Sequence, residues 1–423
     1  MTQRRKLQLV YIFVDLLSSE LVWLMFLLFR WLAYEGRVFG VDTIILPAFD
    51  FYRPLLLYPL ACLAIYYLSG YYLRVEHKRL SREFVTTLIS SIIIALLAFF
   101  VIVIDDAVSN YHRYLWSLLV LWVLQFGISY PFRVITTLFI SRHVHSVSTH
   151  HISGIEDIQS LNIHPGDLVV IDSTEHTDDA ELYRIISILY PMDVQIALVP
   201  TLSDMVKGAA RIPNIDSNPL VMLTEYTMPD WELCVKRATD IVVSALAIIL
   251  LSPIFLMIYA VVWLSSKGPA IYKQERIGLH GKPFSILKFR TMIVDAEADT
   301  PLLSQDSDPR ITRIGHFLRK YRLDELPQLW NVFRGDMSLV GPRPERQYFI
   351  NQIMQQAPYY CLLYKIRPGL TSWGPIRVGY TDTIEKMIAR LNYDIVYMEN
   401  MSLRLDIKIL FFTFGVIIDG KGK

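Results

Sequence analysis

Long apolar segments fill the first third of the chain. Four of them cover about residues 9–31, 54–72, 84–104 and 114–140. Each contains the ~20 residues that a helix needs to cross a hydrocarbon core about 30 Å thick. The first segment is too long for the apolar part of a signal peptide and lacks a small-residue cleavage site. The pattern therefore predicts an α-helical, four-span membrane bundle over residues 1–140.

The pattern of polar and apolar residues changes after residue 166. Short apolar runs at 168–172 and 194–199, with a third candidate at 220–223, are typical of buried strands. Between the first two, residues 178–189 repeat apolar positions at helical spacing. Strands that alternate with helices predict a small parallel α/β unit, and we assign residues 141–228 to a degenerate Rossmann-like module.

Nucleotide binding by this module would need a glycine-rich turn after its first strand, because backbone amides must approach the phosphates. Residues 141–154 contain no such turn. We therefore expect a structural or regulatory spacer that contributes little to the chemistry, with nucleotide sensing as the alternative.

A fifth apolar stretch, at about 240–266, is long enough to cross a bilayer at a rise of about 1.5 Å per residue. Both of its flanks are basic, and basic flanks stay in the cytoplasm. Ser252-Pro253 lies at its midpoint, where proline kinks a helix and a hydroxyl can satisfy the freed carbonyl. We predict a re-entrant helix, with an ordinary proline-kinked span as the alternative. The flanking cations are Lys236, Arg237, Lys267, Lys273 and Arg276.

Composition agrees with a membrane protein. Of 423 residues, 53% are hydrophobic and 19% are charged, whereas soluble proteins average roughly 45–50% and about 25%. The formal net charge is only +1, so anions must be bound by local clusters of cations. Cys62, Cys234 and Cys361 are scattered without metal-ligand spacing, and we expect unpaired thiols in a reducing compartment.

Cations outside the four spans predict the orientation. They precede the first span, fill the loop after the second and follow the fourth, whereas Asp105 and Asp106 occupy the loop after the third. This places the N-terminus and everything after Arg142 in the cytoplasm. Four charged residues lie within or at the edges of the spans, and they either pair between helices or handle lipid: Asp15, Glu20, Arg30 and Arg133.

A dense group of cations follows the fifth apolar stretch. Short strands at 270–274 and 283–288 would present Arg276 and Lys288 near the membrane surface. Such a group is either a phosphate-binding surface or a helix face turned to solvent or lipid headgroups. The cations that crowd the next helical stretch are Arg310, Arg313, His316, Arg319, Lys320 and Arg322.

The sequence Leu323-Asp324-Glu325-Leu326-Pro327 favours phosphate chemistry. Asp is a preferred N-cap and proline is tolerated in a first turn, so we predict a helix from Asp324 to about residue 333. Its positive end would stabilise a carboxylate and a phosphate together. Of two adjacent carboxylates, one can attack phosphorus and the other can hold Mg²⁺. A plain helix cap is the alternative role for Asp324.

A second predicted feature of the site is the turn Gly341-Pro342-Arg343-Pro344-Glu345. Its prolines make it rigid, and Arg343 gives it a planar donor fork suited to a phosphate or the edge of a base. A structural proline loop is the alternative.

Nine motifs follow one another in the C-terminal half: Lys236-Arg237 with Asp240, Ser252-Pro253, Gln274 with Arg276 and Gly278, Lys288-Phe289-Arg290-Thr291-Met292, Asp308-Pro309-Arg310, Leu323-Asp324-Glu325-Leu326-Pro327-Gln328, Arg334-Gly335-Asp336-Met337-Ser338, Gly341-Pro342-Arg343-Pro344 and Arg367-Pro368-Gly369. In number, order and spacing they resemble the bacterial sugar transferases, also called polyprenyl-phosphate sugar-1-phosphate transferases or phosphoglycosyl transferases. The resemblance runs from about Trp231 to the end of the chain. The preceding spans and α/β module resemble the family's long form.

The resemblance implies a monotopic α/β catalytic domain over residues 229–423 and a defined reaction. A nucleoside-diphosphate sugar, usually a UDP-sugar, donates sugar 1-phosphate to undecaprenyl phosphate, and UMP is released. This is the first membrane step of exopolysaccharide, capsule or O-antigen synthesis.

The resemblance also implies roles for individual residues. Asp324 is implied as the nucleophile that forms a phosphosugar-enzyme intermediate, and Glu325, together with Asp324, as the ligand of a Mg²⁺ cofactor. Residues 372–380 depart from the family's usual sequence, so no sugar or uridine contact is carried over there. The implied substrate-binding residues are Lys288 and Arg319 on phosphate, Pro342, Arg343 and Pro344 in the nucleotide-binding turn, and Arg276, Arg310 and Arg367 in neighbouring motifs.

The resulting hypothesis is a multi-pass enzyme of the bacterial inner membrane whose catalytic domain faces the cytoplasm. Its partners would be a UDP-sugar, undecaprenyl phosphate and membrane lipid, without nucleic acid, and pairing of chains stays open. Residues 403–418 would form an interfacial amphipathic helix, a buried packing helix, or both. Two other functions stay open: a glycosyltransferase that releases a nucleoside diphosphate, and a membrane scaffold or nucleotide sensor.

Overall fold

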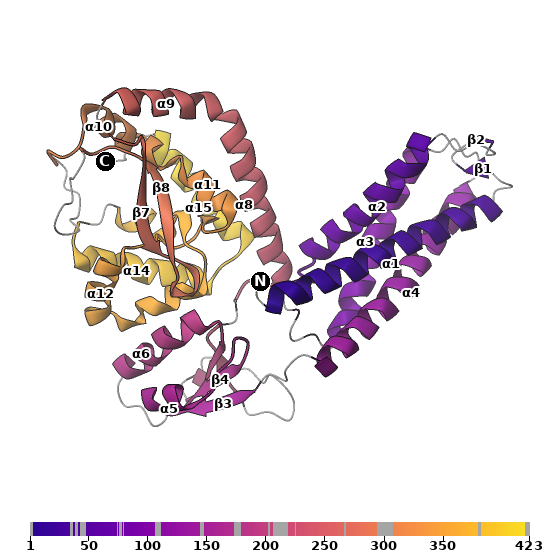
Figure 1. Ribbon diagram of the computed structural model, residues 1–423, viewed down its shortest axis with the longest axis horizontal. Coiled ribbons are helices and arrows are strands. Elements are labelled where there is room, and N and C mark those ends of the chain that lie inside the picture. The colour runs from indigo at the N-terminus through magenta and orange to yellow at the C-terminus, as the bar shows by residue number, and fades with distance from the viewer. Residues whose placement is uncertain are drawn as a thin grey trace. The chain divides into compact units, whose positions relative to one another are not determined.

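The computed structural model divides the chain into two compact units (Figure 1). One unit combines Met1–Ser146 with Asp230–Val235, and the other combines Val147–Pro229 with Lys236–Lys423. The predicted middle module therefore shares a compact unit with most of the C-terminal region. The structure describes residues 3–33, 37–38, 41–42, 48–73, 75, 78, 80–105, 111–143, 148–172, 179–201, 204–205, 219–224, 226–265, 268–293, 308–379 and 382–418.

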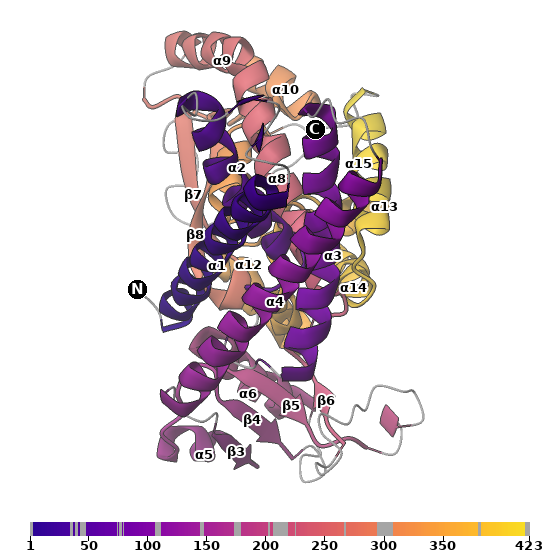
Figure 2. The same ribbon diagram turned by 90° about the vertical axis from the view of Figure 1, so that its right-hand side faces the viewer.

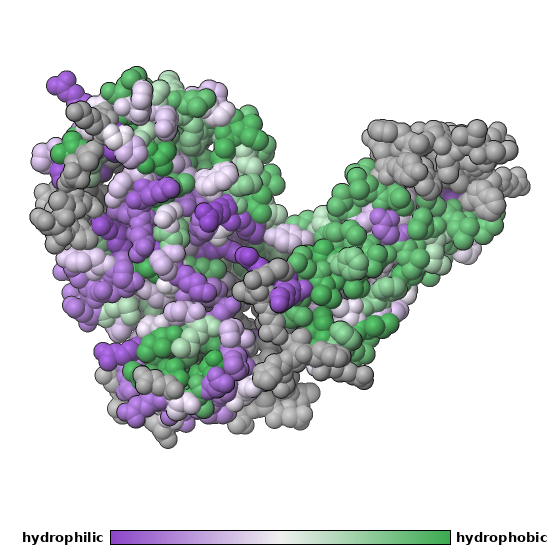
Figure 3. Space-filling view, in the orientation of Figure 1, coloured by the Kyte–Doolittle hydropathy of each residue, from purple (hydrophilic) through white to green (hydrophobic). Residues whose placement is uncertain are grey.

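Four long helices make up most of the first unit: α1 (Gln3–Ala33), α2 (Ala48–Leu68), α3 (Leu80–Asp105) and α4 (Tyr111–His143). A short antiparallel pair, β1 (Arg37–Val38) and β2 (Val41–Asp42), lies between the first two in sequence. Hydrophobic side chains cover the outside of these helices (Figure 3). The predicted helices are confirmed, but the apolar part of α2 is shorter than a span. The segments that are long and apolar enough to cross a membrane are Arg5–Arg30, Glu83–Phe100 and Leu115–Ser141. The apolar segment of α2, Leu55–Leu68, falls short of that length.

A buried ion pair ties three helices of the first unit together. Arg133 of α4 donates two hydrogen bonds to Asp15 of α1, Nε–Oδ1 at 2.7 Å and Nη2–Oδ2 at 3.0 Å. Its Nη1 donates to Thr87 of α3 at 3.0 Å, and its guanidinium lies 3.7 Å from the ring centres of Tyr66 and Tyr71. A buried pair is tolerated only when its remaining hydrogen bonds are satisfied, as they are here. Of the two roles predicted for the charges in this region, pairing between helices holds for Asp15 and Arg133.

A four-stranded sheet forms the middle of the chain (Figure 2). The predicted strands at 168–172 and 194–199 are parallel neighbours, as expected, but the third candidate at 220–223 pairs antiparallel, so the sheet is mixed rather than purely parallel. A further parallel strand precedes them. The predicted helix is confirmed as α6 (Asp179–Leu189). The apolar pattern does not predict the first strand, because His150 and His151 interrupt it. In sheet order the strands are β3 (Thr149–Ile152), β4 (Leu168–Ile171), β5 (Gln195–Leu198) and β6 (Val221–Met222).

A side chain closes the first turn of this sheet. Helix α5 (Ile155–Ser160) begins after Gly154, and the amides of Ser153 and Gly154 both donate to Asp157 Oδ2, at 2.7 and 3.1 Å. In a nucleotide-binding module, amides at this position would face a phosphate. Because the Asp157 carboxylate occupies them, the turn supports a structural role over nucleotide sensing.

The middle sheet and the C-terminal region share one hydrophobic core. Helix α6 and the turn η1 (Tyr190–Met192) pack on the 3₁₀ segment η4 (Pro358–Lys365). The ring centres of Tyr190 and Tyr364 are 6.4 Å apart, edge to face. Both belong to one cluster of buried side chains that also contains Ile185, Ile186, Leu189, Tyr360 and Cys361. The middle module is thus built into the fold of the C-terminal region.

The C-terminal region begins with two apolar helices and a β-hairpin (Figure 1). Helices α8 (Asp230–Leu250) and α9 (Ser252–Ser265) are followed by the antiparallel strands β7 (Ile271–Ile277) and β8 (Pro283–Phe289), joined by η2 (Leu279–Gly281). The elements that follow are α10 (Arg313–Lys320), η3 (Leu323–Glu325), α11 (Gln328–Arg334), β9 (Ser338–Val340), α12 (Gln347–Gln356), η4, β10 (Gly369–Thr371), α13 (Trp373–Val378), α14 (Ile384–Glu399) and α15 (Leu403–Ile418).

The predicted break in the fifth apolar stretch is present between α8 and α9, which meet at a bend of 63°. Pro253 has no N–H, so the carbonyl of Ile249 loses its helical partner. The hydroxyl of Ser252 donates to that carbonyl at 2.8 Å. Ser252 and Pro253 therefore create the bend and satisfy its backbone at the same time.

We expect Tyr190→Ala to destabilise the protein by about 3–5 kcal/mol, because it removes a buried ring from the shared core. Thermal unfolding in detergent would report this as a lower unfolding temperature. Met192→Ala, in the same turn but exposed, is the matched control and should change the unfolding temperature little. Equal effects of the two substitutions would contradict a shared core.

Candidate active site

The Asp324-Glu325 pair lies in the 3₁₀ turn η3, between α10 and α11. The helix predicted from Asp324 is wrong at its start, since α11 begins only at Gln328, with Pro327 before it. Asp324 caps no helix, because no amide at the start of η3 or α11 donates to its side chain. The plain-cap alternative for Asp324 is therefore wrong.

Arg322, directly before this turn, adopts a left-handed backbone conformation, with φ 56° and ψ 21°. Such a conformation is unfavourable for a residue with a side chain. Strained residues persist where the surrounding structure fixes them, and they cluster at functional sites. The strain here lies directly beside the two carboxylates.

Three cations surround the carboxylate of Glu325. Lys288 Nζ and Arg343 Nη2 both lie 3.0 Å from Glu325 Oε1, and Arg322 Nη1 lies 3.7 Å from Oε2. The residue is 8% exposed. Burial alone would raise the pKa of Glu325, but Lys288, Arg343 and Arg322 hold it well below its ordinary value. Glu325 is thus a fixed anion.

Asp324 is the opposite case. Its side chain is also buried, yet it forms no hydrogen bond or ion pair with any residue that the structure describes. Burial and the neighbouring charge of Glu325 raise the pKa of Asp324, and Lys288, Arg319 and Arg322 only partly oppose this. Two carboxylates whose environments push their pKa values apart are typical of groups with different chemical duties.

A side-chain amide positions Lys288. Asn331 of α11 accepts from the amide of Leu287 at 3.1 Å and donates to the carbonyl of Ser285 at 2.8 Å. It therefore pairs with the edge of β8 as another strand would, and it fixes β8 against the helix that follows the acidic pair. Lys288, the next residue along this strand, is directed to Glu325.

The turn that carries Arg343 is held by close backbone contacts. Gly341 N donates to Thr371 O at 3.0 Å, and Gly369 N donates to Pro342 O at 2.9 Å. A Cβ atom on Gly341 would lie 2.4 Å from the carbonyl oxygen of Arg367, so only glycine fits. The turn is therefore rigid, as predicted.

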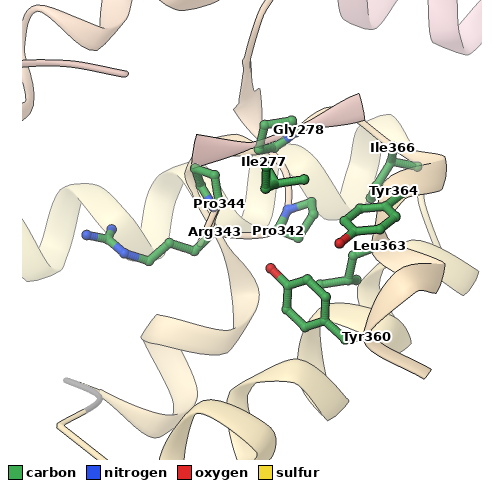
Figure 4. Close-up of a pocket in the computed structure, with 10 residues that line it drawn as sticks. Ile277, Gly278, Pro342, Arg343, Pro344, Tyr360, Leu363, Tyr364 and Ile366 are labelled. Atoms are coloured by element: carbon green, nitrogen blue, oxygen red, sulfur yellow. The ribbon is translucent and has the colours of Figure 1, made fainter. Parts of the chain in front are cut away.

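A small and largely apolar pocket lies behind this turn. Figure 4 shows the side chains of Tyr360 and Tyr364 directed toward Pro342, whereas the guanidinium of Arg343 points away from the pocket. Since that guanidinium contacts Glu325, the turn presents its charged side to the acidic pair and its apolar side to the pocket.

Arg319 is also brought to the acidic pair. It lies in the last turn of α10 and donates from Nε to Thr291 Oγ1 at 2.9 Å. It is one of the cations that partly oppose the rise in the pKa of Asp324. Helix α10 is itself fixed on the same residue, because Thr312 N donates to Thr291 O at 2.9 Å. Its cap is Thr312, whose side chain accepts from Gly315 N at 3.0 Å.

Two other predicted residues hold neighbouring loops. Arg310 pairs with Asp308, Nε–Oδ1 at 2.8 Å, and this contact lowers the pKa of Asp308 to about 2. Arg367 Nε donates to the carbonyl of Gly335 at 3.1 Å. These contacts are structural, whatever further part the two side chains take in binding.

Arg276 lies behind the Arg343 turn. It donates to the carbonyl of Pro344 at 3.0 Å and to Glu345 Oε2 at 3.1 Å. Arg276 therefore contacts the end of the turn, at Pro344 and Glu345. Three residues that no predicted motif of the sequence includes also support the site, and only the folded chain shows them: Asn331, Arg390 and Asp394.

Comparison with known proteins connects this site to a family. A family model described as bacterial sugar transferase matches residues 231–420. The chain is 34% identical over 256 residues to the UDP-N-acetylgalactosamine-undecaprenyl-phosphate N-acetylgalactosaminephosphotransferase of Aeromonas hydrophila, which is 60% of each chain. It is 36% identical over 261 residues to the UDP-glucose:undecaprenyl-phosphate glucose-1-phosphate transferase of Escherichia coli (strain K12), 61% of this chain and 55% of that one.

A third relative is matched over a larger share of its length. The UDP-glucose:undecaprenyl-phosphate glucose-1-phosphate transferase of Caulobacter vibrioides is 43% identical over 180 residues, which is 42% of this chain and 67% of that one. The chain spans little more than half of the length of the first two relatives.

We expect Asp324→Asn to raise stability at neutral pH. The folded pKa of Asp324 is raised above its unfolded value, so the protonated form favours folding and this contribution is lost as the pH rises through the folded pKa. Asn stays neutral. Near neutral pH the free energy of unfolding of the variant should be higher by about 1 kcal/mol or more, and its unfolding temperature should rise accordingly. The difference should vanish at acidic pH.

Glu325→Gln is the control of opposite sign. The folded pKa of Glu325 is lowered, so its charge stabilises the fold at neutral pH and this contribution is lost as the pH falls. The variant should unfold at a lower temperature near neutral pH. Shifts of the same sign in both variants would contradict the different environments assigned to the two carboxylates.

Proposed function

This chain belongs to the bacterial sugar transferase family, and we propose that it transfers a sugar 1-phosphate from a UDP-sugar to undecaprenyl phosphate and releases UMP. One observation carries the proposal. Asp324 is buried without a partner among the described residues, next to a glutamate whose charge three cations balance. This arrangement supplies a free carboxylate at a site prepared for phosphate oxygens.

In the first step, a carboxylate oxygen of Asp324 attacks the phosphorus atom that carries the sugar. A bond forms between this oxygen and phosphorus. The bond from phosphorus to the bridging oxygen breaks, and its electron pair leaves with UMP. Because the pKa of Asp324 is raised, its ionised form is more basic than an ordinary carboxylate and is a better nucleophile. The product is an aspartyl phosphosugar intermediate.

In the second step, a phosphate oxygen of undecaprenyl phosphate attacks the same phosphorus atom. The bond to Asp324 breaks, and its electron pair returns to the carboxylate, so that undecaprenyl-diphosphate sugar is formed. Lys288, Arg319 and Arg343 lie around the pair and are suited to neutralise the phosphoryl oxygens in both steps. Pro342 and Pro344 hold Arg343 in a nucleotide-binding turn.

The cofactor in this proposal is Mg²⁺, held by Glu325 and Asp324. Protein-bound Mg²⁺ usually takes one or two carboxylates and completes its shell with substrate phosphates and water. The described residues contain no group of three or more His, Cys, Asp or Glu that could form an all-protein site. The acidic pair therefore fits a metal that arrives with the diphosphate, where it would neutralise charge on the phosphoryl oxygens.

We further propose that α8 and α9 form a re-entrant membrane helix. Lys236 of α8 donates to Val340 O at 2.8 Å, and Asp240 accepts from Leu339 N at 2.9 Å. At the other end, α9 packs against Phe289 and neighbouring apolar residues of the same unit. Attachment of both parts of the bent pair to one compact fold supports a placement in which the two ends lie on the same side of a bilayer.

The exposed apolar surface supports the same placement. Helices α8 and α9 expose large hydrophobic residues, and α15 exposes Phe411, Phe412 and Phe414 while it buries Asp406 and Ile409. Helix α15 thus combines a packing face with a face for the membrane interface. We place the enzyme in the bacterial inner membrane with its catalytic region in the cytoplasm, as the first membrane step of exopolysaccharide, capsule or O-antigen synthesis.

The middle module in this proposal is a reduced Rossmann-like unit without a nucleotide site. Its parallel strands support that assignment, and Asp157 occupies the amides that a phosphate would need. The rival glycosyltransferase would release UDP, and a scaffold would release nothing. The nucleotide product therefore separates the three functions.

The nucleophile can be tested by intact-mass analysis after mixing the enzyme with a UDP-sugar and Mg²⁺ but no lipid acceptor. The parent chain should gain the mass of a sugar phosphate and release UMP. Asp324→Asn should gain nothing, and its turnover with lipid should fall by several orders of magnitude, equivalent to several kcal/mol of barrier. UDP-glucose and UDP-N-acetylgalactosamine are the first donors to test.

Glu325→Gln serves as the matched control for this experiment. It should also lose activity, but part of the loss should return at high Mg²⁺ if the substitution weakens metal binding. Turnover of Asp324→Asn near the parent rate would overturn the nucleophile assignment, and release of UDP would overturn the reaction class.

The topology can be tested with single cysteines in a chain whose three native cysteines are replaced. Cysteines at Glu232 and Lys282 should both resist a membrane-impermeant maleimide in intact spheroplasts and react after lysis. A cysteine at Asn110, in the loop predicted outside, should react before lysis. Labelling of Glu232 and Lys282 from opposite sides would make residues 240–266 a true span.

A further inference from the structure

We propose that Asp394, in helix α14, is a positioning residue that sets Arg343 against Glu325 by holding residues 371–374, to which the Arg343 turn is hydrogen-bonded. The inference rests on the proposed function, because it concerns the same site. Asp394 touches neither carboxylate of the acidic pair, so it acts on the chemistry only through Arg343.

The hydrogen bonds of Asp394 go to the start of α13. The amide of Gly374 donates to Oδ1 at 3.1 Å, and the hydroxyl of Ser372 makes a short hydrogen bond to the same oxygen. Asp394 is 2% exposed. Thr371, the residue before Ser372, accepts from the amide of Gly341 at 3.0 Å. One buried carboxylate thus fixes the segment on which the Arg343 turn is held.

A neighbouring residue of α14 holds the other end of the same turn. Arg390 Nη2 forms a short ion pair with Glu345 Oε1, and Arg276 binds Glu345 Oε2 at 3.1 Å. Arg276 also donates to Pro344 O at 3.0 Å. Helix α14 therefore fixes the turn twice, indirectly through Asp394 and residues 371–374, and directly through Arg390 at Glu345.

The contact between α14 and the start of α13 leaves no room for a side chain at position 374. A Cβ atom on Gly374 would lie 2.3 Å from Arg390 Cγ and 3.0 Å from Asp394 Oδ1. Burying a carboxylate costs free energy unless it is fully hydrogen-bonded. Here the donors are Ser372 and Gly374, so a weaker acceptor at position 394 loosens the segment that holds the Arg343 turn.

A double-mutant cycle with Arg343 tests this assignment. We expect Asp394→Asn to lower kcat/KM for the UDP-sugar about tenfold or more, since hydrogen bonds to a charged acceptor are stronger than those to a neutral one. In an Arg343→Ala background, Asp394 has no guanidinium left to position. The same Asp394→Asn change should then lower kcat/KM less than about threefold. A radiolabelled donor keeps the residual turnover of Arg343→Ala measurable.

Asp167→Asn is the matched control. Asp167 is also a buried carboxylate, and it accepts from the amides of Ser148 and His164 at 3.1 and 2.9 Å in the middle module. Its substitution should lower the unfolding temperature, as Asp394→Asn should. Its effect on kcat/KM should be small and should be the same with Arg343 and with alanine at that position.

An equal factor for Asp394→Asn in both backgrounds would overturn the proposal and leave Asp394 a stability residue only. If Asp394→Asn does not fold, Ser372→Ala removes one of its donors and enters the same cycle with the same two outcomes. If the parent chain releases no UMP, the proposed reaction itself is contradicted. This outcome would be seen before any variant is compared.

Discussion

The charge balance around Glu325 is the interaction on which the rest of the site depends. Two adjacent carboxylates cannot both be buried and ionised without cations, because like charges repel and burial removes water. Lys288, Arg343 and Arg322 supply that charge, and they come from strand β8, the turn after β9 and the residue before η3. Because Glu325 takes these cations, Asp324 keeps no partner among the described residues. The two neighbours differ in their partners, and this difference separates their chemistry.

A strand of three residues joins this charge balance to the bent apolar helix. The amide of Leu339 donates to Asp240 and the carbonyl of Val340 accepts from Lys236, both in α8. The next residue, Gly341, opens the turn that carries Arg343. The basic residues at the start of the apolar stretch therefore do more than mark a membrane side, since Lys236 binds the backbone beside the site. The position of the apolar helix and the position of Arg343 are set by the same short strand.

The parts of this structure that depend on local sequence could be predicted, and the parts that depend on packing could not. Apolar length predicts α1, α3 and α4, and Ser252-Pro253 predicts the bend, because both effects act within one helix. Capping preference predicts a helix start at Asp324, but the chain forms a 3₁₀ turn there and starts α11 after Pro327. The motifs locate the acidic pair and its cations. They do not reveal Asp394 or Arg390, which support the turn only through the tertiary fold.

The site concentrates local instability that its surroundings compensate. A buried carboxylate without a described partner and a left-handed Arg322 each cost roughly 1–3 kcal/mol. The groups around them are paired: Asn331 satisfies both polar groups at the edge of β8, and Asp394 accepts from Ser372 and Gly374. A network of this kind holds its members in one arrangement, because loss of any partner leaves a buried charge or amide unsatisfied. The unpaired carboxylate of Asp324 is therefore fixed in position by its neighbours while its charge stays available to a substrate.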